Sequence, residues 1–428
     1  MIPKIIDLSL QNRYIILFIA LGMFAWGIYA IKENPIDAIP DLSENQVIVF
    51  TELMGRSPQV IEDQVTYPLV SNLQGIPKIK NIRGTSMFGM SFVYIIFEDN
   101  VDIYWARTRV LERLNYAQRL LPEGVTPTLG PDGTGVGHIF WYTLDAKKMD
   151  LGEQRALQDW YVKFALQTVP GVAEVASFGG FEKQYQLVLN PLKLQYYKIS
   201  LMDVMNKVKA SNNDVGGRKF EMSDMAYIIR GLGYIKNKED LESIAVGNYN
   251  GIPVRVKDIG SVQMGGDLRL GIFDENGEGE VVGGIVVMRY GENADNVIDA
   301  VKVKMKEVQK GLPEGVSFNV SYDRSTLIEA AIETIKFKLL EEIAVVSIIV
   351  ILFLFHWRSA LSIIIQIPVT IAISFLLLNA FGLSSNIMSL TGIALAIGVI
   401  VDNGIIMSEN SYRQLSEWQN DPKNKNHE

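Results

Sequence analysis

Four long apolar runs divide the chain. The first covers residues 14–31, and the other three, 339–357, 360–381 and 388–409, follow one another near the end of the sequence. Each is close to the roughly 20 residues that cross a bilayer, so the pattern predicts four transmembrane helices. A cleaved signal peptide is the alternative for the first run, but the run is long for one and no clear cleavage site follows it.

Residues 35–335 lie between the first and second runs and contain an internal repeat. LQGIPKIKNIRG begins at Leu73 and LQTVPGVAEVAS at Leu166, an offset of 93, whereas LPEGVT at Leu121 and LPEGVS at Leu312 are 191 apart. The flanking patterns alternate between the helix and strand periods. They predict two copies of a strand–helix–strand–strand–helix–strand unit, the ferredoxin-like split β-α-β arrangement.

The two offsets differ because the second copy is interrupted. Residues 191–280 are rich in Asn, Gly and charge and are expected to form a small, inserted, β-rich subdomain. The predicted fold is therefore an α+β membrane protein with a large periplasmic region. Its expected segments are a start and first helix (1–34), a first ferredoxin-like unit (35–132), a second ferredoxin-like unit with the insertion at about 191–280 (133–335), helices two to four (336–410) and a cytoplasmic tail (411–428).

Basic residues set the expected orientation of the helices. Lys4 and Arg13 precede the first run, Arg358 lies in the turn between the second and third, and Arg413, Lys423 and Lys425 follow the fourth. Because short cytoplasmic segments are enriched in Lys and Arg, both ends of the chain are predicted to be cytoplasmic and residues 35–335 periplasmic.

The fourth run carries an acidic residue, Asp402, well inside an apolar helix. A carboxylate at that depth costs about 2.5–3.5 kcal/mol on insertion scales, so it is expected to face a bundle interior and to have a function. Ala394, Gly398 and Asp402 recur every four residues, and Gly392 and Ala396 form a second pair. Small residues at this spacing predict close packing against another helix.

Composition narrows the functional classes. Apolar residues make up 48% and charged residues 21%, which fits a folded soluble region combined with a few membrane helices. The net charge of −8 argues against a nucleic-acid binder, and the absence of cysteine excludes disulfides and thiolate metal clusters. No nucleophile–base arrangement or phosphate loop is recognisable, so an enzyme is not expected.

Several strings resemble one family of transporters. NPIDAIPDLSENQVIV, FEDNVDIYWARTRVLE, LGPDGTGVG, VPGVAEVASFGG, YDRS, HWRSAL and NIMSLTGIALAIGVIVDNGIIMSEN are similar to the N-terminal half of resistance–nodulation–division (RND) permeases. Within that family they resemble the heavy-metal branch of copper/silver type. The resemblance covers essentially the whole chain and implies a C-terminal half that lies outside it. It also implies that the two ferredoxin-like units are porter units and that the insertion at about 191–280 is a docking subdomain.

The resemblance implies roles for particular residues. Asp402 matches the proton-relay aspartate, and desolvation in an apolar bundle would let its carboxyl group exchange protons near neutral pH. Met388 and Met407 match positions of a membrane methionine ladder, whose third position is Ile400 here. A thioether is a soft ligand suited to Cu(I) and Ag(I). The zinc/cobalt/cadmium branch has extra acids on this helix, and the turn LAIG has none, which favours monovalent ions.

The expected function is therefore proton-driven efflux of copper and silver ions at the bacterial inner membrane. The expected partners are the missing C-terminal half, two further copies in a homotrimer, a periplasmic membrane-fusion adaptor and an outer-membrane channel. No permanently bound cofactor is expected, only the transported metal ions and protons. The alternatives are a multidrug RND permease and a split or truncated membrane scaffold that does not transport.

Overall fold

The structure is a computed structural model that describes residues 2–37, 39–222, 224–269, 271–354 and 357–420. The predicted basic residues Lys423 and Lys425 therefore lie outside the described residues. The chain divides into two compact units. The first comprises residues 1–143, 162–176 and 284–428, and the second comprises residues 144–161 and 177–283.

The first sheet has four strands in the order β2-β3-β1-β4. Its elements are β1 (Gln46–Glu52), α3 (Pro58–Ile61), the π-helix η1 (Glu62–Thr66), α4 (Tyr67–Leu73), β2 (Ile79–Met87), β3 (Met90–Phe97), α5 (Ile103–Ala117), the 3-10 helix η2 (Gln118–Leu120) and β4 (Thr128–Leu129). Val47 and Val49 of β1 and Val93 and Ile95 of β3 are buried, alternate with half-buried positions and pack under the helices. This alternation is the period of two that leaves a strand one apolar face.

A second four-stranded sheet has the order β14-β5-β13-β6. Its elements are β5 (Gly133–Asp145), α6 (Leu151–Leu157), the π-helix η3 (Gln158–Val162), α7 (Lys163–Gln167), β6 (Val172–Phe178), β13 (Val282–Arg289), α12 (Ala294–Gln309) and β14 (Ser317–Asp323). In both sheets the third strand of the unit pairs with the first, and the second and fourth strands take the edges. The chain therefore builds the same strand order twice.

The repeated strings occupy equivalent places in these two units. The string from Leu73 joins α4 to β2, and the string from Leu166 joins α7 to β6. The strings from Leu121 and Leu312 each follow the second helix and precede the last strand. The two offsets therefore reflect one pattern with an insertion between β6 and β13.

The second compact unit contains the inserted segment and begins earlier in the chain than residue 191. Besides α6 and most of η3, its elements are β7 (Lys183–Leu189), α8 (Pro191–Tyr197), α9 (Leu201–Ser211), β8 (Val215–Met222), β9 (Met225–Gly231), α10 (Lys238–Ser243), β10 (Ala245–Tyr249), β11 (Ile252–Arg255), α11 (Val256–Ile259) and β12 (Gly260–Gly266). The pairs β7–β12, β8–β9 and β10–β11 are antiparallel. Helices and strands share its apolar core, which includes Val204, Leu241 and Val262.

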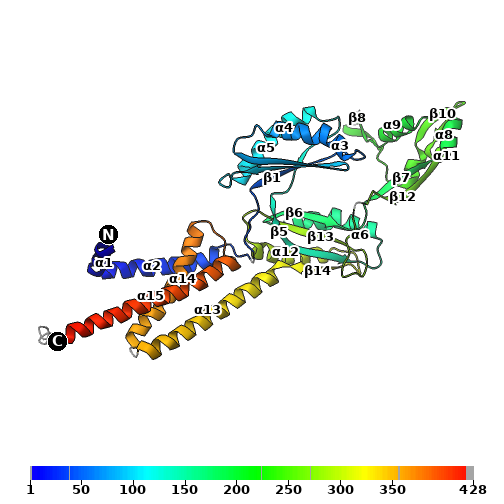
Figure 1. The fold of residues 1–428 in the computed structure, drawn as a ribbon. Helices are drawn as coiled ribbons and strands as arrows, with labels where there is room; N and C mark the ends of the chain where they lie inside the picture. Colours follow the sequence, from blue (N-terminus) through cyan, green and yellow to red (C-terminus); the bar gives the residue numbers. More distant parts are fainter. Residues whose placement is uncertain (1, 38, 223, 270, 355–356, 421–428) are drawn as a thin grey trace. The chain divides into compact units, whose positions relative to one another are not determined.

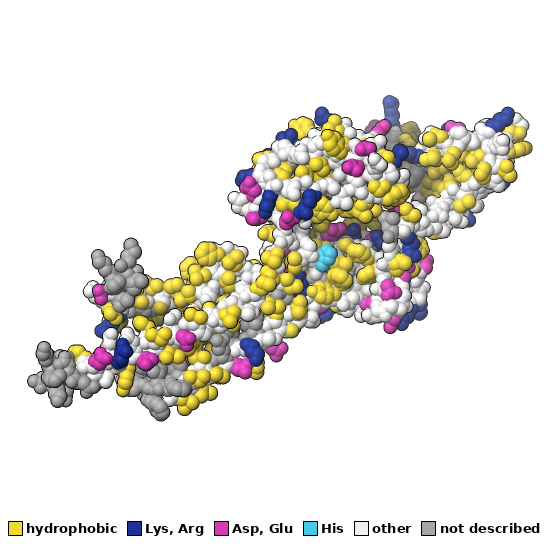
Figure 2. Space-filling view, in the orientation of Figure 1, with side chains coloured by type: hydrophobic (Ala, Val, Ile, Leu, Met, Phe, Trp, Pro, Cys, Tyr) yellow, Lys and Arg dark blue, Asp and Glu magenta, His cyan; other side chains and the backbone are white. Residues whose placement is uncertain are grey.

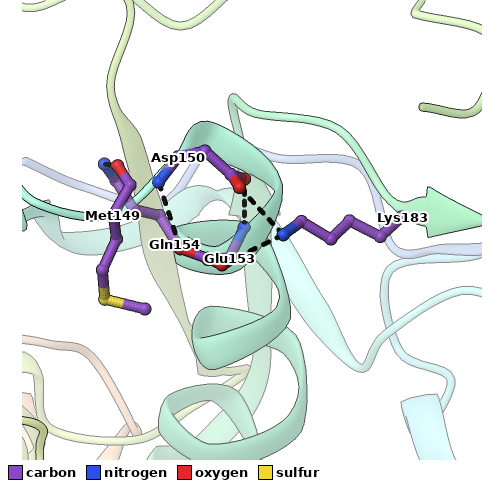
Figure 3. A network of polar contacts seen from close by, with 5 residues as sticks. All are labelled: Met149, Asp150, Glu153, Gln154 and Lys183. Carbon is purple, nitrogen blue, oxygen red and sulfur yellow. Dashed lines mark hydrogen bonds and ion pairs between the residues drawn. The ribbon is translucent and has the colours of Figure 1, made fainter. Parts of the chain in front are cut away.

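A polar network fixes the start of α6 to the strand that enters the insertion (Figure 3). The Asp150 carboxylate accepts the backbone N–H of Glu153, and the Glu153 carboxylate accepts the backbone N–H of Asp150. The Lys183 Nζ at the start of β7 lies 2.9 Å from Asp150 Oδ2 and 3.4 Å from Glu153 Oε1. The hydrogen bond from Lys183 lowers the pKa of Asp150, and its partner carboxylate raises the pKa of Lys183.

Five helices complete the first compact unit: α1 (Ile2–Gln11), α2 (Arg13–Glu33), α13 (Arg324–Leu354), α14 (Trp357–Ala380) and α15 (Ile387–Asn420). The last four pack side by side, α14 against α2 and α15, and α13 against α14 and α15 (Figure 1). Pro368 lies inside α14 without ending it. The helices α13 and α15 are longer than the apolar runs that predict them.

Length and composition separate these helices. Among the described residues, two helical stretches are long and apolar enough to cross a membrane, Arg13–Glu33 and Ile387–Trp418, and Ile364–Ala380 is a shorter apolar stretch. Two of the four predicted spanning helices therefore satisfy this criterion of length and hydropathy among the described residues. The run at 339–357 belongs to α13, whose end adjoins residues 355–356 outside the described residues.

Candidate functional site

The helix α15 carries every residue that the sequence singled out for proton or metal chemistry. One stripe of it packs into a small apolar core, where Ile397 and Val401 are buried together with Ile367 of α14. Ile393 and Ile405 extend the stripe by one turn at each end. The four α15 positions recur every four residues, so they form a single face directed at α13 and α14.

Asp402, Met388 and Met407 lie outside that stripe. The side chain of Asp402 is exposed, and the two methionines are each 68% exposed. The helices of this chain alone therefore do not enclose Asp402 in a bundle interior. Leu395, which lies seven residues from both Met388 and Asp402 and so on the same side of the helix, is 73% exposed. Figure 2 shows hydrophobic side chains along these helices.

The helix keeps the three candidate residues apart. Met388 and Asp402 are 14 residues apart on one continuous helix, which separates them by about 21 Å along the axis. Met388 and Met407 are separated by about 28 Å on the same rise of about 1.5 Å per residue. The two thioethers cannot bind one ion together, so each would need further ligands from other elements.

Two of the small residues of α15, Gly392 and Ala396, do not make close helix contacts within the described residues. A Cβ atom built on Gly392 would meet nothing within 4 Å, and Ala396 is exposed. The close approach occurs elsewhere, between α2 and α14. A Cβ built on Gly27 would lie 2.8 Å from the Cβ of Ala372 and against that residue's backbone carbonyl. The sequence analysis did not identify this contact.

Hydrogen bonds to the segment after α2 hold the loop before α15. The side-chain amide of Asn34 donates to the Ser385 hydroxyl at 2.6 Å, and both residues are buried. The backbone N–H of Ser385 donates to the carbonyl of Pro35, and the N–H of Asp37 donates to the carbonyl of Ser385. Two segments far apart in the sequence thus pair like short parallel strands.

The same segment forms an ion pair with the start of α13. The Arg324 Nη2 lies 2.8 Å from the Asp37 Oδ1, with side chains 3% and 18% exposed. The Arg324 Nη1 donates a hydrogen bond to the backbone carbonyl of Val136 in β5. The Arg324 Nε, also buried, has no hydrogen-bond partner among the described residues. We call Asn34, Asp37, Arg324 and Ser385 the polar clamp.

The polar clamp joins four elements at one place. It connects the end of α2, the start of α13, the loop before α15 and the strand β5 of the second sheet. Asn386 continues it into α15, because its side chain accepts the backbone N–H of Ser389 at 3.0 Å. Polar contacts therefore connect the start of α15 to the second sheet through the end of α2 and the start of α13. Sequence reasoning missed these roles, although Asp37 and Arg324 are charged residues close to predicted membrane helices.

Comparisons with known proteins give this arrangement a context. The sequence profile of the AcrB/AcrD/AcrF family matches residues 5–428. The cation efflux system proteins SilA of Salmonella typhimurium and CusA of Escherichia coli K12 are each 48% identical over 98% of this chain. A crystal structure of a heavy metal efflux pump matches 96% of the chain with a TM-score of 0.84 and 33% identity. The chain spans about 40% of the length of these relatives and 41% of that structure.

Proposed function

Because the chain belongs to the AcrB/AcrD/AcrF family and corresponds to the N-terminal half of a CusA-like RND pump, we propose that it takes part in proton-driven efflux of copper and silver ions. The observation that carries the proposal is the 48% identity to two cation efflux proteins over 98% of the chain. Efflux would require the remaining half, since the chain spans 40% of those relatives. The chain itself is not proposed to be an enzyme.

Monovalent copper and silver are the proposed ions for two reasons. The turn from Leu395 to Gly398 carries no acidic residue that would favour a harder divalent cation. Met388 and Met407 place soft thioether ligands on the same helix, at exposed positions that other elements can approach. The two residues are proposed as separate ligands, because the helix holds them too far apart to share one ion.

Asp402 is the proposed proton carrier. It lies on an exposed apolar surface of α15, where a permanently charged carboxylate would be unfavourable in a bilayer. Uptake and release of a proton would change the charge of this helix, and the polar clamp offers a route by which movement of α15 reaches β5. The basic partner of Asp402 is proposed to come from the other half of the pump.

The proposed architecture has four membrane helices and two ferredoxin-like porter units. The strand orders β2-β3-β1-β4 and β14-β5-β13-β6 support the two ferredoxin-like units, because each is the order of a split β-α-β unit. The helices α2, α13, α14 and α15 are the four proposed membrane helices. We place the chain in the bacterial inner membrane with both sheets in the periplasm. A homotrimer, a periplasmic adaptor and an outer-membrane channel are the proposed partners.

Metal tolerance tests the transport proposal. A bacterial strain that lacks its own copper and silver exporter would receive this chain together with the C-terminal half of CusA. Tolerance to both ions should rise, Asp402→Asn should abolish the gain, and Glu409→Gln on the same helix should leave it unchanged. Tolerance that is unaffected by Asp402→Asn would refute the relay. A gain against organic drugs instead of metals would favour a multidrug permease.

Orientation can be tested directly because the chain contains no cysteine. Single cysteines would replace Glu123, in the loop before β4, and Asn410, near the cytoplasmic end proposed for α15. A membrane-impermeant maleimide should label the first in spheroplasts and the second only after permeabilisation. Equal labelling of both from one side would contradict the proposed topology.

A further inference from the structure

Three methionines lie together at one end of the first sheet. Met87 ends β2 and Met90 begins β3, and the two are register partners across a turn of two residues. Side chains of directly paired residues have Cβ atoms about 4.5–5.5 Å apart. Met54 follows β1, the strand that pairs with β3 on its other side.

Met87 and Met90 point to the sheet face away from the helices. Their neighbours Ser86 and Ser91 point the other way, because both hydroxyls contact the Thr66 hydroxyl, at 2.7 and 2.8 Å, on the helix side of the sheet. Successive strand residues alternate between faces. The two methionine side chains are therefore on the open face, and Met87 is 51% exposed.

Met54 reaches the same corner. The backbone N–H of Leu53 donates to the carbonyl of Gly89, so β1 continues its ladder with β3 past Glu52. The side chain of Leu53 packs against the apolar core, and Met54, the next residue, begins the turn after β1 and is 51% exposed. A Cβ built on Gly89 would lie 2.9 Å from the Met54 Sδ, so this sulfur is within about 8 Å of the Met90 Cα.

The chemistry of this corner suits a soft cation. A cluster of three or more His, Asp or Glu able to hold a metal ion is not found among the residues that the structure describes, so a hard-ligand site is not on offer there. Three thioethers are the ligands that favour Cu(I) and Ag(I). Glu52, the exposed register partner of Met90, adds a carboxylate that attracts a cation to the same face.

We propose that Met54, Met87 and Met90 form a three-sulfur binding site for a monovalent soft cation, Cu(I) or Ag(I), on the open face of the first sheet. The flexible, polarizable methionine side chains can close around an ion without moving the strands. The physiological meaning of the site rests on the proposed metal efflux, for which it would capture ions outside the membrane. Binding itself does not depend on transport.

Cu(I) competition titration of the purified full chain tests the site. The protein would carry Met388→Leu and Met407→Leu, so that the membrane methionines do not contribute, and would compete with a colorimetric Cu(I) chelator under reducing conditions. The triple change Met54→Leu, Met87→Leu and Met90→Leu in this protein should remove one bound Cu(I) per chain. The single change Met54→Leu should weaken binding by about tenfold or more, the loss typical of a perturbed metal site.

A second methionine pair provides the matched control. Met222 and Met225 are register partners at the turn of β8–β9, 55% and 62% exposed, in the same cross-strand geometry. Replacing both by leucine should leave the Cu(I) stoichiometry and affinity of the three-sulfur site unchanged. If this double variant loses as much binding as the triple variant, or if the triple variant binds as the parent does, the site does not exist.

The number of sulfur ligands gives an independent readout. X-ray absorption of bound Cu(I) should report three sulfur neighbours in the parent and two in Met54→Leu, a change at an exposed turn residue that Leu replaces at similar volume. An unchanged sulfur count would overturn the assignment of Met54. A chain that binds Cu(I) at this site but confers no metal tolerance when the C-terminal half is supplied would refute the transport proposal and leave the site intact.

Discussion

Replacing Asp37 by asparagine gives the sharpest test of the polar clamp. The change removes the anionic partner of Arg324, whose side chain is 3% exposed. Removing one member of a buried ion pair typically costs about 3–5 kcal/mol, because the other charge stays buried without compensation. Asp37 is 18% exposed, so water can partly solvate the site, and the expected cost is at the lower end, about 3 kcal/mol.

The assay is urea unfolding of the detergent-solubilised chain followed by tryptophan fluorescence. The control is Glu44→Gln, which breaks the ion pair with Arg83 in which both side chains are about half exposed, 51% and 55%. Exposed pairs contribute about 0–1 kcal/mol, so the control should change little. If Asp37→Asn costs no more than Glu44→Gln, the reasoning about buried charge at the clamp is wrong.

A double variant separates the charge effect from lost contacts. Arg324→Met removes the buried cation but leaves the Val136 carbonyl without its donor, which costs about 1–3 kcal/mol. In the Asp37→Asn, Arg324→Met chain no charge remains unpaired. The sum of the two single losses in unfolding free energy should therefore exceed the loss in the double variant by about 1 kcal/mol or more. Strict additivity would show that the two side chains do not interact.

Three further predictions concern single elements, each measured as an unfolding midpoint in detergent. Gly27→Leu should destabilise the chain by about 1–3 kcal/mol through overpacking against α14, whereas Gly22→Leu on the same helix, with open space around it, should not; equal effects would contradict the close crossing. Burial, and then neighbouring acidic side chains, raise the pKa of Asp295, so the folded state holds that proton more tightly and ionisation costs stability at pH 7. Asp295→Asn should therefore stabilise the folded chain at pH 7, and this gain in stability should shrink as the pH falls below the raised pKa. A gain that grows at low pH would show that the pKa of Asp295 is not raised by folding. Asn293→Ala should cost about 1 kcal/mol, because it removes the N-cap of α12, whereas Asn293→Asp keeps a capping oxygen and should leave the stability nearly unchanged. Equal stability of the Ala and Asp variants would contradict a role of the cap.

The sequence predicted elements wherever a period or a string repeated. The strings at Leu73 and Leu166 mark the same junction in two units, and the unequal offsets predicted an insertion in the second unit. The ends of the helices were harder, because hydropathy reports only the apolar part. The first turns of α13, from Arg324, and the last turns of α15, to Asn420, are polar and helical, so no apolar run marks them.

The sequence predicted which residues belong to the candidate site but not what surrounds them. Asp402 was expected inside a bundle, and this chain leaves it exposed, because enclosure depends on which helices pack against its face. The polar clamp depends on residues 351 positions apart, Asn34 and Ser385, and on a charge pair that no local pattern encodes. Likewise, Met54, Met87 and Met90 meet only because the strand register brings two turns together.

The exposed surface around Asp402 connects these findings. Val399 and Ile406, exposed by 65% and 62%, flank it at helical spacing, so an acidic residue sits in the middle of an uncovered apolar stripe. In the proposed membrane placement of α15, a charged Asp402 that faces lipid would cost about 2.5–3.5 kcal/mol, which favours cover of the stripe by a protein surface whenever Asp402 is charged. A partner that covers the stripe would contact Asp402 on one side of α15, and its contacts would differ between the charged and the neutral carboxyl group. The buried residues Ile397 and Val401 pack the other side of α15 against α13 and α14. Proton binding at Asp402 would thus act on the fit between α15 and that partner, and the polar clamp at the helix start is where such a change would reach β5.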